Sequence, residues 1–218
     1  MKKKQQYYLV FGLIAVLLVV DQVVKILVKT HMFIGQDIAL IGDWCYLHFI
    51  ENEGFAFGTS FGGTAGKIGL SVFRLVASAA LLWYLLHTMK KDGRTSFVVS
   101  LALIFVGAVG NIIDSCFYGM IFSESSYTIA TLFPPEGGYA PFLQGKVVDM
   151  FYFPLFEFDW PRWMPWIGGS HFTFFNAIFN VADAAITVGA FWLIIDQLIQ
   201  EHKRKKEKKA TEGDAEVS

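Results

Sequence analysis

Two aspartates in apolar surroundings are the residues of this sequence best suited to chemistry. Asp149 follows Val147 and Val148, and Asp183 lies at the start of a long apolar run. A carboxylate in or beside hydrocarbon is energetically costly, so its presence commonly marks a functional site. Two neighbouring carboxylates do not both ionise easily, so one can hold a proton while the other acts as a base. If the two aspartates meet, they predict hydrolysis by aspartic-protease chemistry.

The elements that must position these aspartates are helices that span a membrane. The chain has 218 residues, of which 54% are hydrophobic, and its mean hydropathy of +0.46 is too high for a soluble protein. A spanning helix needs about 20 apolar residues. Suitable stretches occupy residues 7–28, 65–87, 97–113 and 177–199. We therefore expect a single integral-membrane domain over residues 1–200 and a charged, disordered tail over residues 201–218.

Basic residues flank alternate ends of these spans. They cluster in residues 2–4, 90–94 and 203–209. The positive-inside rule then places both termini and the 89–95 loop in the cytoplasm. Residues 29–64 and 114–176 are external in this topology.

The external segments hold several further signals. The alternating pattern of residues 37–61 predicts short strands, and within it Asn52 is either a support of the site or a turn residue beside Gly54. Cys45 and Cys116 can form a disulfide or remain free. Amphipathic aromatic rings that suit the membrane–water interface belong to Trp160, Trp163 and Trp166.

The same topology brings polar residues to the outer ends of the spans. They are Asp21, Lys25, Arg74, Asn111, Asp114, Asn180 and Asp183. We interpret Asp21 and Lys25, one helical turn apart, as a structural ion pair. Asp114 is either a helix-end residue near the site or a structural partner of Arg74, and we favour the structural role.

Spacing on the third and fourth spans predicts how they pack. In the fourth span, positions i, i+4, i+7 and i+11 share one face and are Asn176, Asn180, Asp183 and Thr187. In the third span, Gly107 and Gly110 allow a neighbouring helix to approach closely.

Five segments, in order along nearly the whole chain, resemble motifs of the lipoprotein signal peptidases, the bacterial type II signal peptidases. They are Asp21-Gln22-Val23-Val24-Lys25, Glu51-Asn52-Glu53-Gly54-Phe55-Ala56-Phe57-Gly58, Gly110-Asn111-Ile112-Ile113-Asp114, Val147-Val148-Asp149 and Phe179-Asn180-Val181-Ala182-Asp183. The resemblance implies a membrane α-helical protein, a four-helix bundle with a small extracytoplasmic β-sheet cradle and long external loops, in the bacterial cytoplasmic (inner) membrane.

The resemblance also implies an activity and its residues. The activity is removal of a prolipoprotein signal peptide immediately before a diacylglyceryl-modified cysteine, at the outer leaflet. Asp149 and Asp183 would be the catalytic pair, with supporting or substrate-binding roles for Asn52, Asn111, Asn180 and Asp114. Membrane lipids and cyclic-peptide inhibitors of the globomycin type would be further ligands, and no cofactor or nucleic acid is expected.

Two features depart from the family's pattern. The family usually has Arg directly after its Gly-Asn-x-x-Asp motif, whereas this chain has Ser115, so that role passes to another basic residue such as Arg162 or is lost. The segments 117–144 and 153–173 are longer than the family's usual loops, which the fold tolerates because long loops add little entropic cost.

Other chemistries have weaker support. The five His residues are scattered and do not form a His-Glu-x-x-His zinc pattern, and a Ser–Lys peptidase would have to use Lys25, the only intramembrane lysine expected. The rival of another class is a proton-coupled transporter, in which intramembrane carboxylates relay protons. Transporters usually show repeats and broken helices at mid-depth, whereas the charges here gather at one side, which favours catalysis.

Overall fold

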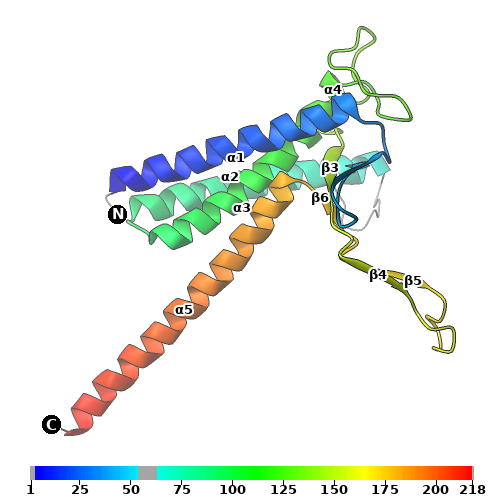
Figure 1. Ribbon diagram of the computed structural model, residues 1–218. Coiled ribbons are helices and arrows are strands. Elements are labelled where there is room, and N and C mark those ends of the chain that lie inside the picture. The colour runs from blue at the N-terminus through cyan, green and yellow to red at the C-terminus, as the bar shows by residue number, and fades with distance from the viewer. Residues whose placement is uncertain (1–2, 54–62, 218) are drawn as a thin grey trace.

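Four helices long and apolar enough to cross a membrane dominate the computed structural model, which describes residues 3–53 and 63–217. They are α1 (Lys3–His31), α2 (Gly63–Lys90), α3 (Thr95–Ile113) and α5 (Val181–Val217). The helices α1, α2 and α3 run side by side, and the far half of α5 extends beyond them (Figure 1). The four expected spans are confirmed, and the chain is a multi-pass membrane protein.

The fourth span begins later than the sequence indicated. Ile178 and Phe179 form a short strand, β6 (Ile178–Phe179), and the helix starts only at Val181. The start is set by Asn180, whose side-chain oxygen accepts the backbone N–H of Asp183 at 2.8 Å and so caps the helix. The predicted four-residue polar face is therefore wrong in its first half, because Asn176 precedes the helix.

The far end of the fourth span also differs from expectation. The helix α5 continues through residues 201–217, where a disordered tail was expected. The segment is rich in Lys, Glu and Ala, which have high helix propensity. A Glu201–Lys205 pair at 2.6 Å, with i,i+4 spacing, adds local support to the helix.

The third helix leads directly into a π-helical turn. This turn, η2 (Asp114–Tyr118), is followed by the short helix α4 (Gly119–Ile121). π-helical turns occur frequently at functional sites. Here the turn buries Asp114 and Ser115, and the Ser115 hydroxyl donates to the Asn111 carbonyl at 3.0 Å.

The external segments form a small antiparallel sheet with strand order β1-β2-β3-β6. Its longer strands are β1 (Asp37–Ile41), β2 (Cys45–Asn52) and β3 (Val147–Tyr152). Ile50 of β2 lies opposite Asp149 of β3. The expected sheet is thus confirmed over residues 37–52, while Gly54 and Gly58 of the second motif lie outside the described residues.

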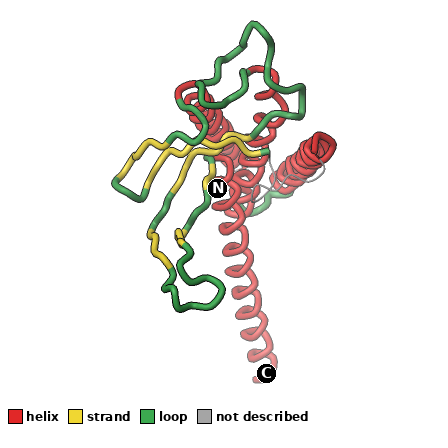
Figure 2. The backbone as a smooth tube through the Cα atoms, turned by 90° about the vertical axis from the view of Figure 1, so that its right-hand side faces the viewer, coloured by secondary structure: helices red, strands yellow, loops and turns green. Residues whose placement is uncertain are grey.

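A separate two-stranded hairpin interrupts the path from β3 to β6. Its strands are β4 (Phe156–Asp159) and β5 (His171–Phe174). The hairpin projects away from the four-stranded sheet, on the side opposite the long loop between α4 and β3 (Figures 1 and 2).

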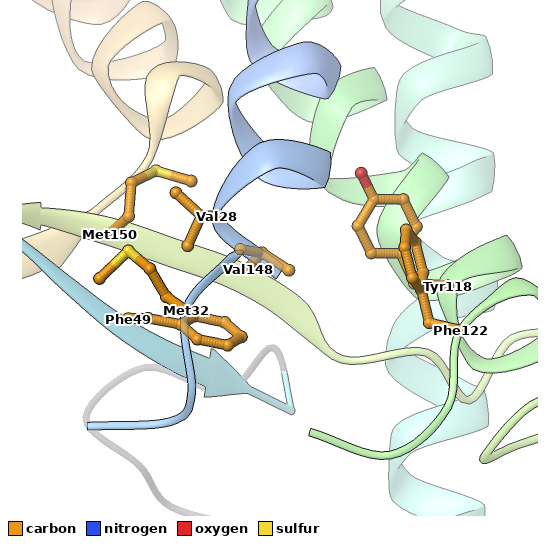
Figure 3. Close-up of a cluster of buried hydrophobic side chains, with 7 residues drawn as sticks. All are labelled: Val28, Met32, Phe49, Tyr118, Phe122, Val148 and Met150. Atoms are coloured by element: carbon orange, nitrogen blue, oxygen red, sulfur yellow. The ribbon is translucent and has the colours of Figure 1, made fainter. Parts of the chain in front are cut away.

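An apolar cluster fixes the sheet to the helices. It joins the end of α1, strands β2 and β3 and the segment after α3, through Val28, Met32, Phe49, Tyr118, Phe122, Val148 and Met150 (Figure 3). Val148 and Met150 flank Asp149 and are fully buried, so their packing holds the aspartate's strand against α1.

Cys45 and Cys116 are both buried and do not form a disulfide, so of the two alternatives the structure favours two free thiols.

Two of the three basic clusters, the one at the start of α1 and that of residues 90–94, lie together at the opposite end of the bundle. Lys3 pairs with Asp92 at 3.0 Å, and Arg94 pairs with Asp196 at 2.6 Å. These contacts bring the start of α1, the α2–α3 loop and the middle of α5 to one end. The sheet and the polar residues of the motifs are at the other.

Candidate active site

Asn180 lies at the centre of the polar site and contacts both aspartates. It is fully buried, and its side-chain amide donates to Oδ1 of Asp149 at 2.7 Å and to the Val148 carbonyl at 3.2 Å. Its backbone N–H donates to Oδ2 of Asp183 at 3.4 Å, while its side-chain oxygen accepts the N–H of Asp183. This reciprocal arrangement is a capping box. The residue that starts α5 therefore also joins that helix to β3.

Asp183 occupies the first turn of α5. A carboxylate is favoured there by the free N–H groups and by the helix dipole. Its Oδ1 accepts a hydrogen bond from the Asn111 side-chain amide at 2.8 Å, and its side chain is only partly buried. Asp183 is thus held in place on one side and remains accessible on the other.

Asp149 is the more deeply buried of the two aspartates, with 3% of the residue exposed. Its Oδ1 accepts from Asn180, and its Oδ2 accepts from the Asn52 amide at 3.4 Å. Burial, followed by the nearby charge of Asp183, raises the pKa of Asp149 from 3.8 to about 7. The raised pKa lets this carboxyl hold a proton near neutral pH, although the hydrogen bonds from the two amides act in the opposite direction and favour its ionised form.

A second polar cluster, built around Lys25, adjoins the first. The fully buried ammonium of Lys25 lies 2.8 Å from Asp114 and 3.1 Å from Asp21. It also donates to the side-chain oxygen of Asn111 at 2.9 Å, and that oxygen accepts from Asn180 at 3.1 Å. Asn111 therefore connects the lysine cluster to the two aspartates.

The lysine cluster fixes the elements that carry the site. Oδ1 of Asp21 accepts the backbone N–H of Ala182, one residue before Asp183, at 2.8 Å. Oδ2 of Asp114 accepts the backbone N–H of Val148, one residue before Asp149, at 3.2 Å. Each structural carboxylate thus anchors the backbone next to one of the two predicted catalytic residues.

Two glycines of α3 permit the close approach of α5. A Cβ added at Gly107 would lie 2.2 Å from the Ala182 carbonyl oxygen, and one at Gly110 would lie 2.6 Å from Oδ2 of Asp21. Real Cβ atoms do not tolerate such distances, so these positions require glycine. The expected role of both residues in helix packing is confirmed.

A cavity of about 340 Å³ opens beside Asp183. Asn111 and Asp183 form part of its wall together with Arg74 of α2, and the rest is mainly apolar, including Phe73, Leu81, Ile104 and Ile186. The charge of Arg74 interacts with both Asp183 and Asp149. The cavity thus combines an apolar wall, a cation and one of the two aspartates.

The structure brings the predicted site residues together in two groups. Asn52, Asn111 and Asn180 contact the aspartates directly, whereas Asp114 reaches them through Lys25. The predicted pairing of Asp114 with Arg74 is replaced by pairing with Lys25, and Arg74 lies in the cavity wall instead. Arg162 lies on the loop between β4 and β5.

Sequence reasoning assigned no role to two further buried groups. The Gln22 side-chain amide donates to Asp21 at 3.0 Å and to Asp114 at 3.1 Å, and its oxygen accepts from the Tyr118 hydroxyl at 3.2 Å. Lys29 pairs with Glu51, and the Ser125 hydroxyl contacts both. The positions of these residues in the sequence could have indicated their roles: Gln22 lies inside the first motif, and Lys29 lies one helical turn beyond Lys25.

Comparison with known proteins identifies the family of this chain. A family profile described as signal peptidase (SPase) II matches residues 13–199. The lipoprotein signal peptidase of Porphyromonas gingivalis is 48% identical over 187 residues, covering 85% of this chain and 81% of that protein. The lipoprotein signal peptidase of Amoebophilus asiaticus is 32% identical over 214 residues, covering 97% of this chain and 85% of its own length.

Solved structures show a similar fold. A bacterial membrane enzyme determined by the in meso method at 2.3 Å resolution matches with a TM-score of 0.58 and 23% identity, covering 88% of each chain. A second such structure, at 1.9 Å resolution, matches with a TM-score of 0.56 and 24% identity, covering 87% of this chain and 92% of the other. Together with the profile match, these findings mean that the chain belongs to the lipoprotein signal peptidase (SPase II) family, membrane aspartic peptidases that cleave signal peptides from prolipoproteins.

Proposed function

We propose that Asp149 and Asp183 are the catalytic pair with which this peptidase removes the signal peptide from diacylglyceryl-modified prolipoproteins. The observation that carries the proposal is their shared partner, because Asn180 bonds to both carboxylates. One carboxylate is buried and holds a proton near neutral pH, and the other is accessible from a cavity. That difference in environment divides the roles of acid and base.

The division of roles follows from burial. Asp183, ionised, takes a proton from a water molecule as the water oxygen attacks the scissile carbonyl carbon, and Asp149 donates its proton to the carbonyl oxygen. The tetrahedral intermediate then breaks: the leaving nitrogen takes the proton from Asp183, and the re-forming carbonyl returns a proton to Asp149. Protons balance over the cycle, and the pair returns to its starting state.

In this protein, Arg74 is the cation that contacts the bound substrate. Ser115, in the position where the family usually has Arg, is buried and bonded to the Asn111 carbonyl. Arg74 instead lines the cavity that holds Asp183. Its guanidinium is suited to a carbonyl oxygen of the bound peptide, because it presents several donors in a fixed plane.

The cavity's apolar wall favours a substrate that stays attached to the membrane. The wall is built from α2, α3 and α5, so a lipidated peptide can enter from the side while its acyl chains remain in lipid. The basic end of the bundle then lies in the cytoplasm, and the catalytic end lies at the outer leaflet of the cytoplasmic membrane. Cyclic-peptide inhibitors of the globomycin type would compete in the same cavity.

The test is cleavage of a purified, diacylglyceryl-modified prolipoprotein by wild-type protein and by the Asp149→Asn and Asp183→Asn variants. Asp37→Asn is the matched control, because Asp37 is exposed on β1 and bonds to His48. We expect cleavage by the wild type and the control and none by the two active-site variants. Cleavage by either active-site variant overturns the pair, and equal cleavage of an unlipidated prolipoprotein overturns the substrate class.

A further inference from the structure

The β4–β5 hairpin has one face made of aromatic rings. Phe156 stacks on its cross-strand partner Phe174 at 4.6 Å between ring centroids, and Phe158 pairs in the same way with Phe172 at 5.1 Å. Trp160 continues the row, 4.9 Å from Phe158. These rings are not buried in the fold: Phe156 is 52% exposed and Phe174 is 43% exposed.

The opposite face of the hairpin is polar. The alternate residues of the two strands pair Glu157 with Thr173 and Asp159 with His171. They are joined by side-chain hydrogen bonds, at 3.3 Å between Thr173 and Glu157 and at 2.8 Å between His171 and Asp159. The hairpin is therefore an amphipathic ribbon with its two characters on opposite sides.

The tip of the hairpin is a closed turn that presents further apolar groups. Backbone N–H groups of Trp160 and Gly169 bond to the carbonyls of Ser170 and Trp160, at 3.0 and 2.8 Å. The turn contains three exposed apolar side chains, those of Ile167, Trp163 and Trp166. Trp166 is fully exposed and has a φ of 75°. A bulky residue rarely adopts a positive φ, so the turn holds this ring outward against a conformational cost.

The position of the hairpin relative to the spans determines what can cover its aromatic face. Phe175, next to β5, lies 6.1 Å from Phe179 of β6, which comes just before the start of α5. This ring contact thus links the residue that follows β5 to the start of a membrane-spanning helix. In Figure 1 the hairpin lies beyond the ends of α1, α2 and α3 and runs obliquely to them, so it is placed at the level of the membrane surface and not among the spans.

Where the hairpin joins the four-stranded sheet, the surface is polar enough to face water. A cavity of about 540 Å³ there has acidic residues in its wall, including Asp37, Asp43 and Glu157. Carboxylates in such number are costly in lipid. Phe156 of the aromatic face also lines this cavity, so water reaches the root of the hairpin, and the rings beyond the root are left for the membrane.

We propose that residues 155–175 form an arm that lies flat on the outer-leaflet interface, with its aromatic face and tip among lipid headgroups and upper acyl chains and its polar face in water. Trp and other aromatic rings collect at this depth because they are amphipathic. An isolated two-stranded hairpin is only marginally stable, so lipid contact also supplies the cover that the fold does not. The arm joins β3 to β6, and its lipid contact would hold the strand that carries Asp149 at a constant depth.

The first test compares the two faces by spin labelling of the full-length protein in phosphatidylethanolamine–phosphatidylglycerol nanodiscs. Nitroxides are attached at Ile167→Cys and Phe174→Cys on the aromatic side and at Glu157→Cys and Thr173→Cys on the polar side. The parent protein is the labelling control, because Cys45 and Cys116 are buried. We expect the aromatic-side labels to be more accessible to oxygen than to a nickel chelate, and the polar-side labels to show the reverse.

Equal access of the nickel chelate to all four positions overturns the proposal, since the arm is then in water. Dipolar broadening at Ile167 and Phe174 also overturns it, because a second copy of the chain then covers the face.

The second test is quenching of tryptophan fluorescence by brominated lipid, which we expect to fall in a Trp163→Ser/Trp166→Ser variant. Unchanged quenching contradicts lipid contact at the tip. Cleavage in detergent is expected to be unaffected, so failure here is distinguishable from failure of the catalytic pair.

Discussion

Two clusters of carboxylates, one around Lys25 and one around Asn180, differ in the side chains that hold them. Asp21 and Asp114 share a buried lysine, whereas the described hydrogen bonds to the Asp149 carboxyl come from asparagines. A carboxylate paired with a buried cation serves as an anchor. A carboxyl held by amides can exist with or without its proton, which acid–base catalysis requires. In the mechanism that we propose, the same residue type therefore serves structure in one cluster and chemistry in the other.

The largest expected effect comes from changing the chemical group while preserving its shape. Asp149→Asn and Asp183→Asn should each lower the cleavage rate by at least about 10²- to 10⁴-fold, the range of a lost general acid or base. The melting temperature in detergent should stay near that of the wild type, because Asn is isosteric. Single-turnover cleavage and thermal melting measure the two effects, and comparable damage to both would remove the distinction between the groups.

The structural group should respond in the opposite way. Lys25→Met leaves two buried carboxylates without their cation, which costs about 3–5 kcal/mol when one partner of a buried pair is removed. We expect a lower melting temperature and less protein in the membrane. A variant that melts like the wild type but cleaves slowly would place Lys25 in the chemistry instead.

Asn180→Ala addresses the residue that contacts both members of the proposed catalytic pair. The change removes a helix cap, worth about 1 kcal/mol, and also a hydrogen bond to Asp149. We expect a modest loss of stability and a much larger loss of turnover. Asn180→Ser keeps a capping oxygen but loses the amide, so it should recover stability without recovering turnover.

Arg74→Gln tests the cation of the cavity. Hydrogen bonds to charged groups are worth about 1.5–3 kcal/mol, so kcat/KM for the lipidated prolipoprotein should fall by roughly 10- to 150-fold. Arg74→Lys should recover part of the lost activity.

Ser115→Arg should not raise turnover, because Ser115 is 3% exposed and an arginine there would overpack η2.

The smallest effect is the dependence on pH. With Asp149 titrating at about 7 as the acid, turnover should fall about tenfold for each pH unit above that value. Because the folded pKa lies above the unfolded value of 3.8, the folded state binds more protons between these two values. Stability should therefore decrease as pH rises from about 4 to 7, and melting of Asp149→Asn should lack this contribution. A flat profile in both measurements contradicts the assignment of the proton to Asp149.

Much of this protein is determined by local sequence. The four spans follow from the lengths of the apolar stretches, the small sheet from the alternation in residues 37–52, and the two aspartates from their cost in apolar surroundings. Gly107 and Gly110 were recognisable as packing positions because small residues recur where membrane helices approach closely.

The tertiary structure alone decided which residues meet. Asp114 pairs with Lys25, 89 positions away, and not with Arg74, and Asn180 ends a strand pairing and starts a helix instead of lying within one. These choices depend on which backbones approach and which buried polar groups must find partners, and local spacing does not contain that information. The sequence by itself therefore determined the number of spans and the residues able to do chemistry. Only folding assigned two carboxylates to a lysine and two to a set of asparagines, because a buried charge is set by its neighbours in space.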